Sequence, residues 1–289
     1  MLTAQQVQVR RQTIGASDAP AICGVDPYRN AADVYASKVH EMEPGVENER
    51  MMLGNALEPV LMDLAARELG VPVIRRGDRV VGGERLSVTL DGAAELPEGV
   101  ALVEGKTTGL TAGWGETDDL DDPDAVPKKV LAQTALGLYV TGWQVAYVPV
   151  ILGRHGLTFK LYKIDRDEEL CETVAGACIA FWKNHVEPQV PPPDMAPNLD
   201  VLKRIKRVPG KWAEVSNDIG AEVLVAKDLL KTAMAREKAA REALISEMGD
   251  ADGAETSDYG MWTYFEQARK GYAVEAGSHR VLRHKKPQP

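Results

Sequence analysis

Two acidic residues and a lysine follow two β-rich runs and could together bind a divalent metal ion. Asp91 ends the apolar run of residues 86–90, and Glu104 and Lys106 end the next apolar run. We predict that the two runs are strands joined by a Gly- and Pro-containing turn, residues 92–99, and that their pairing brings the polar ends together. Mg²⁺ prefers oxygen ligands, and a lysine two residues after an acid lies on the same strand face. This D-x12-E-x-K pattern suits metal-assisted phosphodiester hydrolysis, although patterns this short also arise by chance.

A third carboxylate is expected from a helix over residues 51–69. Its apolar residues recur at helical spacing, and Glu58 neighbours Gly54 and Leu61 among them. A charge on an apolar helix face needs a partner, because an unpaired buried charge is costly. Glu58 is therefore a candidate to face the Asp91 edge of the sheet. The competing interpretation is an ordinary glutamate at the boundary between buried and exposed faces.

The N-terminal region contains a candidate phosphate site. Ser17 or Asp18 could cap a short helix that ends at Gly24, and Arg10 and Arg11 precede it. A helix N-terminus with a free hydroxyl and nearby arginines can bind phosphate. The alternative is a plain capped helix with surface arginines.

Composition indicates a globular protein that is not a general coat for nucleic acid. The 289 residues are 44% hydrophobic and carry a formal net charge of −9, which disfavours nonspecific binding to a polyanion but permits a local basic patch. We expect no secretion signal and no membrane span. Three cysteines match no common disulfide or metal spacing, so a cytoplasmic location is expected. The dense acids of residues 116–124 are interpreted as a solvated loop.

The remaining pattern predicts an α/β domain followed by a helical appendage. We predict a domain over residues 1–189, a Pro-rich linker over 190–197 and a C-terminal region over 198–289 with a long, coiled-coil-like helix and a β-hairpin. The other expected elements are helices over 30–40, 127–140 (which carries Gln133) and 167–185, a strand hairpin over 143–152 and 157–164, the long helix over 212–248, and strands over 261–265 and 279–284.

Together these segments resemble the YqaJ-type viral recombinase family, relatives of phage lambda exonuclease within the PD-(D/E)xK nuclease superfamily. The matching segments, in the family's order, are Arg10 with IGASDAPAICGVDPYR, GNALEP around Glu58, LDG at Asp91, VEGKT from Glu104 to Lys106, and AQTALGLYVTG at Gln133. They cover about residues 10 to 165. Two departures are a leucine in place of the usual proline before Asp91, and Gly105 in place of an apolar residue.

The resemblance implies a restriction-endonuclease-like core, a mixed central β-sheet flanked by helices. It further implies cleavage of DNA that depends on Mg²⁺ or Mn²⁺, with two ions. Asp91, Glu104 and the Gly105 carbonyl would bind metal, and Glu58 would complete the site. Lys106 would orient or deprotonate the attacking water. Gln133 would position Lys106 or that water.

In the same way, Arg10 and Ser17 match the pocket that holds a terminal 5′-phosphate in lambda exonuclease, and Arg11 is an equally placed substitute for Arg10. The expected activity is 5′→3′ degradation of linear double-stranded DNA in phage or prophage recombination, inside a bacterial host. A single-strand annealing protein would be a partner, and a homo-oligomer, a ring trimer by family analogy, is possible. The alternatives are a structure-selective or restriction-type endonuclease, or a non-catalytic protein that binds DNA ends or a recombination partner.

Overall fold

The structure, a computed structural model, describes residues 4–45, 48–109, 114–115, 125–153, 156–193 and 195–266. It divides into two compact units, residues 1–206 and 207–289. The elements of the first unit are α1 (Ala4–Gln12), β1 (Ile14–Gly15), η1 (Ala16–Asp18), α2 (Ala19–Ile22), α3 (Ala31–Val39), α4 (Glu49–Leu69), β2 (Val73–Arg75), β3 (Arg79–Val81), β4 (Leu86–Thr89), β5 (Gly92–Leu96), β6 (Gly99–Val103), β7 (Lys106–Thr108), α5 (Lys128–Thr141), β8 (Val145–Gly153), β9 (Leu157–Asp165), α6 (Glu168–Phe181), η3 (Trp182–Val186) and α7 (Leu199–Arg204).

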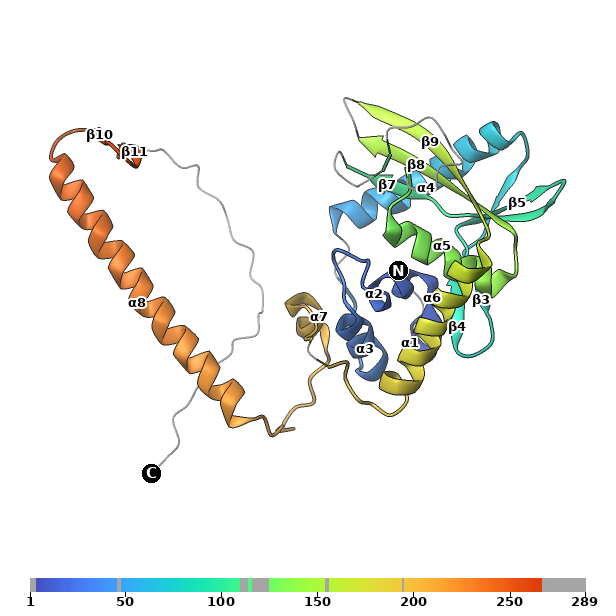
Figure 1. Cartoon of the computed structure of the whole chain (residues 1–289), viewed down its shortest axis with the longest axis horizontal. Coiled ribbons are helices and arrows are strands. Elements are labelled where there is room, and N and C mark those ends of the chain that lie inside the picture. Colours follow the sequence, from blue (N-terminus) through green and yellow to red (C-terminus); the bar gives the residue numbers. More distant parts are fainter. Residues whose placement is uncertain are drawn as a thin grey trace. The chain divides into compact units, whose positions relative to one another are not determined.

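A mixed sheet in the order β2-β5-β6-β8-β7, with β9 also paired to β8, forms the centre of this unit (Figure 1). Strands β6 and β7 both run parallel to β8, and the register is the same for both: Val103 faces Tyr147 and Lys106 faces Val150. The two strands therefore lie end to end along β8, with residues 104–105 between them. This register places Pro149 opposite Gly105, and proline has no N–H to continue the ladder.

Helices cover both faces of the sheet, as the predicted fold class requires. On one face, Leu61 and Met62 of α4 pack with Ala101 and Val103 of β6. On the other, Leu102 packs against α5 within the largest core cluster, which also includes α2, α3 and α6. Successive side chains of β6 therefore pack against the helices on opposite faces of the sheet. The predicted mixed α/β core is confirmed.

The predicted pairing of residues 86–90 with residues 100–103 is wrong. Strand β4 belongs to a second, three-stranded sheet, where it pairs with β1 and β3. The stretch interpreted as a turn contains strand β5, which pairs antiparallel with β6. Its small residues Ala93 and Ala94 are buried in the core, and the turn is confined to the residues between Leu96 and Gly99. The glycine and proline content of the stretch concealed a strand of small residues.

The boundary between the units also differs from the predicted linker at residues 190–197. Residues up to Lys206 bond to the first unit. The backbone N–H of Asn198 and its side-chain amide both donate to the buried Asp33, at 2.6 Å each. Glu43 N donates to the Arg204 carbonyl at 2.6 Å. The proline-rich stretch therefore precedes a segment that is part of the first unit.

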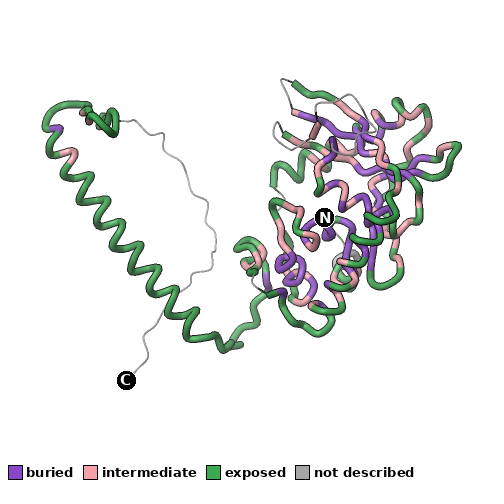
Figure 2. Tube along the Cα trace, in the orientation of Figure 1, coloured by how far each residue is buried: buried purple, intermediate pink, exposed green. Residues whose placement is uncertain are grey.

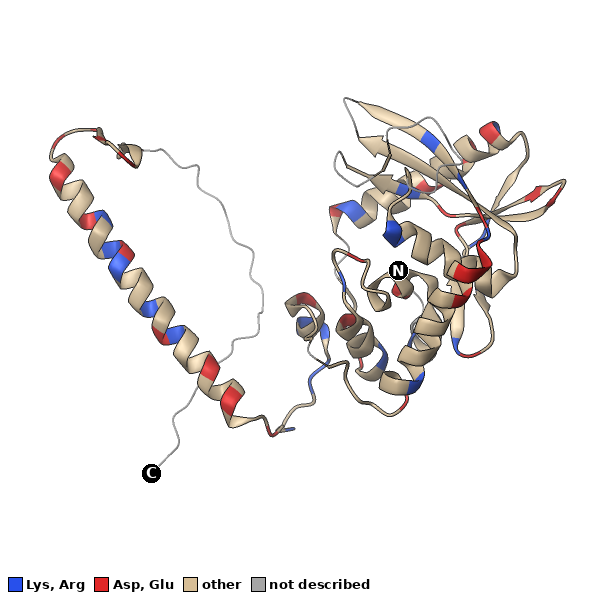
Figure 3. Ribbon diagram, in the orientation of Figure 1, with Lys and Arg blue, Asp and Glu red and all other residues tan. Residues whose placement is uncertain are grey.

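The second unit consists of the long helix α8 (Asn217–Met248) and a hairpin of β10 (Gly253–Thr256) and β11 (Gly260–Thr263). The long helix was predicted. The partner of the predicted strand 261–265 is β10, whereas residues 279–284 lie outside the described residues. Along α8 nearly every residue is exposed (Figure 2), and acidic and basic side chains are interspersed along it (Figure 3). In the described part of the chain, no helix has the length and apolar character that crossing a bilayer requires.

Candidate active site

Asp91 and Glu104 lie at the same end of the β5–β6 hairpin. Asp91 directly precedes β5 and Glu104 directly follows β6, and the register pairs Gly92 with Val103. Antiparallel neighbours of this kind bring the start of one strand beside the end of the other. The Gly105 N–H donates to Asp91 Oδ2 at 3.2 Å. The two acids predicted to meet do so, although through β5 instead of β4.

Glu104, Lys106 and Gln133 form a hydrogen-bonded triangle. Lys106 Nζ donates to Glu104 Oε1 at 2.6 Å and to Gln133 Oε1 at 3.1 Å. Gln133 Nε2, from α5, donates to the same Glu104 oxygen at 2.5 Å. Glu104 is 5% exposed, so its charge depends on these partners. Both donors contact Oε1, which leaves Oε2 to another ligand.

The Gly105 peptide group faces Asp91. The Glu104 N–H donates to the Tyr147 carbonyl of β8 at 3.0 Å. The next residue, Gly105, donates its N–H to Asp91 Oδ2, so its backbone amide faces that carboxylate.

Negative charge at this edge is undercompensated. Burial raises the pKa of Asp91 to about 8, and the charges of Glu104 and Glu58 add to that rise, while Lys106 and the Gly105 N–H oppose it. A carboxyl with such a pKa resists ionisation unless a cation joins it. The charge of Glu58 acts on Asp91, and the metal-binding role of Glu58 stays a prediction.

Glu58 reaches this edge because α4 packs directly on the two glycines beside the acids. A Cβ on Gly92 would lie 2.8 Å from Met62 Sδ, and a Cβ on Gly105 would lie 3.1 Å from Met62 Cε. Met62 is one helical turn beyond Glu58, on the same face. The glycine found where the family has an apolar residue thus gives space to Met62. Arg75 of β2 donates to Glu58 at 3.4 Å.

Among the described residues, no three His, Cys, Asp or Glu side chains form a ready-made metal cage. Glu104 is bonded to Lys106 and Glu58 to Arg75, which draws these carboxylates towards protein cations. The donor set still fits a hard divalent ion. Carboxylate and carbonyl oxygens are its preferred ligands, and burial together with the charge of Glu104 raises the pKa of Asp91, which a bound cation would oppose.

The predicted phosphate residues lie at a second location, around the turn from Gly15 to Asp18. A Cβ on Gly15 would be 3.4 Å from Arg79 Nη2 and 3.8 Å from Ser17 Oγ. Burial and the charge of Arg10 lower the pKa of Arg79, so the two guanidinium groups are neighbours. Arg10, Ser17 and Arg79 therefore gather at one place. Arg79 was not anticipated, because a single arginine in a short β-run has no distinctive sequence pattern.

Asp18 does not cap the short helix that follows it. It is buried and accepts hydrogen bonds from Lys38 Nζ at 2.7 Å, Arg29 Nη2 at 3.0 Å and the Gly15 N–H at 3.2 Å. Burial would raise the pKa of Asp18, but Lys38 and Arg29 hold it well below its ordinary value. Asp18 is thus a structural anchor for the turn that presents Ser17.

Arg11 follows Arg10 directly, but its side chain lines a cavity together with Lys38 and Trp182. The structure therefore does not place the two arginines as equivalents. The acidic cluster of residues 116–124, predicted to be a solvated loop, lies outside the described residues.

Parts of this chain are similar to known proteins. Residues 6–144 match the family described as YqaJ-like viral recombinase domain. YqaJ of Bacillus subtilis (strain 168) is 26% identical over 182 residues, 61% of this chain and 54% of the relative, so the match spans about half the length of that protein. LHK-Exo in complex with dAMP has a TM-score of 0.49 at 17% identity, covering 65% of this chain and 94% of that chain.

The alkaline exonuclease LHK-Exo from Laribacter hongkongensis has a TM-score of 0.48 at 16% identity, with the same coverage. A phage related exonuclease from Haemophilus somnus 129PT has a TM-score of 0.41 at 16% identity, covering 60% of this chain and 94% of that chain. Residues 6–144 of this chain thus resemble the YqaJ-like viral recombinase domain family.

Proposed function

We propose that the protein is a divalent-metal-dependent DNA exonuclease that degrades linear double-stranded DNA from its 5′ ends in phage or prophage recombination. The observation that carries this proposal is the convergence of Asp91, Glu104 and Lys106 at one sheet edge, with Gln133 bonded to both Glu104 and Lys106. Burial raises the pKa of Asp91 to about 8. Because strongly shifted pKa values cluster at functional sites, this supports a catalytic role for the set over a purely structural one.

The proposed metal ligands are Asp91, Glu104, the Gly105 carbonyl and Glu58, with Mg²⁺ or Mn²⁺ as the ion. A bound divalent ion, or a pair, would activate the attacking water and stabilise the leaving oxygen. Glu104 offers Oε2 to the ion because Lys106 and Gln133 bond to Oε1. Lys106 places a positive charge beside the scissile phosphate, where negative charge develops in the transition state. Gln133 fixes the Lys106 ammonium in that position.

The 5′ preference would come from Arg10, Ser17 and Arg79, which lie around the turn from Gly15 to Asp18. A terminal phosphate carries more charge than an internal one and can accept several charge-assisted hydrogen bonds. The second unit, residues 207–289, would serve assembly into a homo-oligomer such as a ring, or the docking of a single-strand annealing protein.

The test compares linear and closed circular duplex DNA, with Mg²⁺ and with EDTA. We expect shortening of linear DNA from its 5′ ends only with Mg²⁺, and intact circles. Lys106→Ala should lower the rate by at least about 100-fold, the size of effect typical of a lost transition-state contact. Lys128→Ala, which removes an exposed lysine at the start of α5, is the matched control.

Cleavage of closed circles would instead identify an endonuclease. DNA binding with no metal-dependent turnover would identify a non-catalytic end-binding protein. If Lys106→Ala cleaves as fast as the wild type, Lys106 has no part in the reaction.

A further inference from the structure

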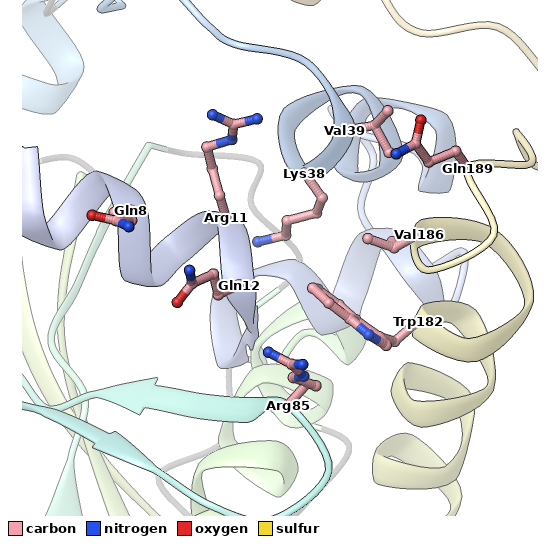
Figure 4. A pocket seen from close by; sticks show the side chains of 9 residues that line it. All are labelled: Gln8, Arg11, Gln12, Lys38, Val39, Arg85, Trp182, Val186 and Gln189. Carbon is pink, nitrogen blue, oxygen red and sulfur yellow. The ribbon is translucent and has the colours of Figure 1, made fainter.

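A cavity of about 400 Å³ lies between α1, α3, the β3–β4 turn and η3, away from the residues proposed to bind metal. Arg11, Lys38, Arg85 and Trp182 line it together with three glutamines and two valines (Figure 4). None of these lining residues is acidic. Its volume is in the range of small-ligand sites and suits a single nucleotide.

Two arginines give this cavity its available positive charge. Lys38 is already bonded to Asp18 at 2.7 Å. Glu41 accepts a hydrogen bond from Lys206 Nζ at 2.8 Å, which is the main cause of its lowered pKa. The charge of Arg11 contributes less to that lowering. Arg85 lies over the ring of Trp182 at 5.6 Å, and Figure 4 shows the two side chains together at one end of the cavity with Arg11 at the other. An anionic ligand would meet a cation at each end.

The backbone around the cavity is unusual, which indicates that its shape is specified. Of the described residues other than glycine, three have positive φ: Glu84 (53°), Arg85 (67°) and Gln189 (57°). Arg85 and Gln189 line the cavity. Glu84 forms an ion pair with Lys183 of η3, at 3.6 Å. The segment η3 that carries Trp182 is a π-helix. Strained backbone and π-turns concentrate at functional sites.

We propose that this cavity binds a nucleotide of single-stranded DNA next to the duplex end. The bases of single strands stack on aromatic rings and guanidinium planes, and Trp182 with Arg85 offers both. Glutamine amides such as those of Gln8 and Gln12 can donate to and accept from base edges. Arg11 meets the backbone phosphate.

The position of the cavity supports this ligand over an acidic peptide. Arg11 directly follows Arg10, which lies at the proposed 5′-phosphate site. Lys38 lines the cavity and also donates to the Arg10 carbonyl at 2.8 Å. The cavity therefore adjoins the place where, under the proposed function on which this inference rests, the end of the duplex is held.

The test measures binding of a fluorescein-labelled (dT)12 oligonucleotide by anisotropy, in EDTA so that no cleavage occurs. Arg85→Gln should weaken binding about 10-fold through the lost guanidinium stacking surface. Arg11→Gln should reduce the slope of log K against log salt by about 0.7, the contribution of one phosphate contact to a single strand. Trp182→Leu should weaken binding roughly 5- to 100-fold through lost stacking, whereas Trp182→Phe keeps most of the affinity.

Matched controls are Arg67→Gln on the exposed end of α4 and Trp212→Leu, whose side chain is 93% exposed; both should bind like the wild type. Arg85 is exposed, so its variant remains informative if Trp182→Leu does not fold. Wild-type affinity in both Arg85→Gln and Trp182→Leu would overturn the proposal, and so would a (Glu)10 peptide that competes as well as unlabelled (dT)12. Duplex degradation with Mg²⁺ is measured on the same preparations. If the variants lose (dT)12 binding while the wild type shows no cleavage with Mg²⁺, the result would refute the proposed nuclease activity and leave the proposed binding site intact.

Discussion

At the scale of single residues, Glu104 organises the candidate site. One of its oxygens accepts from Lys106 and Gln133, which come from a strand and a helix. Asp91, by contrast, accepts a backbone N–H and has an elevated pKa of about 8, chiefly through burial. Of the two carboxylates, Glu104 is thus paired with Lys106 and Gln133, whereas Asp91 has a backbone N–H as its donor and a raised pKa. This difference leads to a pH prediction.

Asp91→Asn should stabilise the metal-free protein at high pH. The folded-state pKa of about 8 lies above the ordinary value of 3.8, so between these values the folded state holds a proton that the unfolded chain has lost. Stability therefore falls as pH rises from about 4 to 8. We expect the variant to exceed the wild type by roughly 2–5 kcal/mol at pH 8.5 and to match it near pH 4. Thermal unfolding in EDTA measures this.

Added Mg²⁺ should raise the melting temperature of the wild type at pH 8.5 and leave that of Asp91→Asn unchanged, because the ion replaces the proton. Asp63→Asn, at an exposed position on α4, is the control and should keep the wild-type profile. Parallel pH profiles for the wild type and Asp91→Asn would contradict the assignment.

Arg79→Gln should reduce the preference for phosphorylated ends. Arg79 is held by Thr89 Oγ1 at 3.3 Å and Thr13 Oγ1 at 3.4 Å, beside Ser17. Loss of a charge-assisted bond of about 1.5–3 kcal/mol predicts a roughly 10- to 100-fold fall in the rate ratio between 5′-phosphate and 5′-hydroxyl duplexes. Arg76→Gln, at an exposed position three residues earlier, should keep the ratio. Equal ratios in both variants would remove Arg79 from phosphate binding.

At the scale of elements, the packing of α4 on the β5–β6 hairpin sets where Glu58 lies. Met62 fills the space above Gly92 and Gly105, so neither glycine can gain a side chain without displacing the helix or its methionine. Both glycines are adjacent to a proposed metal ligand. Close approach of helix to strand is thus built into the site.

Gly92→Ala should destabilise the protein by about 1–3 kcal/mol, since its Cβ would lie 2.8 Å from Met62 Sδ and 3.0 Å from Val73 Cγ1. Met62→Ala in the same chain should relieve part of this cost, giving a coupling of at least about 0.5 kcal/mol in a double-mutant cycle measured by urea unfolding. Gly83→Ala, with no heavy atom within 4 Å of its Cβ, should be neutral. Additive costs would show that Met62 does not press on Gly92.

Sequence patterns revealed helices α2 to α6 and α8, the β8–β9 hairpin and the meeting of Asp91 with Glu104, but not α1 or α7. They did not reveal β5, because its buried side chains include alanines, it begins at Gly92, and the turn that follows it ends at Gly99, a residue of β6. Nor did they reveal Arg79 or the cavity beside Trp182, since these depend on contacts between distant segments. The same limit explains Asp18: a side chain that could cap its own helix instead pairs with Lys38, 20 residues away.

At the scale of the whole molecule, the division after Lys206 gives two units with different character. The three clusters of buried apolar residues in the described part of the chain lie before residue 190. The α8 helix of the second unit has an almost fully exposed surface with apolar side chains such as Ile219, Leu229 and Met234. A helix of this kind is expected to be stabilised by another copy or by a partner.

Two truncations test whether the segment from Asn198 to Lys206 belongs to the first unit. A chain of residues 1–206 should unfold cooperatively within about 2 °C of the first unit in the full chain, because its cores remain. A chain of residues 1–189 loses both Asn198 bonds to the buried Asp33 and the backbone bond from Glu43 to Arg204. Asp33 keeps the hydrogen bond from the Asn30 N–H, but losing the two donors of Asn198 to a buried carboxylate costs about 2–3 kcal/mol, so the melting temperature should fall by roughly 5–10 °C.

The pair of truncations also separates folding from assembly. If α8 joins copies of the chain, residues 1–206 should have the mass of a monomer by light scattering and keep the wild-type melting temperature. Asn198→Ala in the 1–206 chain isolates the contribution of Asp33, and Asn217→Ala in the full chain, at the exposed start of α8, is its matched control. Equal melting temperatures for the 1–189 and 1–206 chains would place the boundary in the proline-rich stretch, since the contacts of Asn198 and Arg204 would then contribute nothing to the fold.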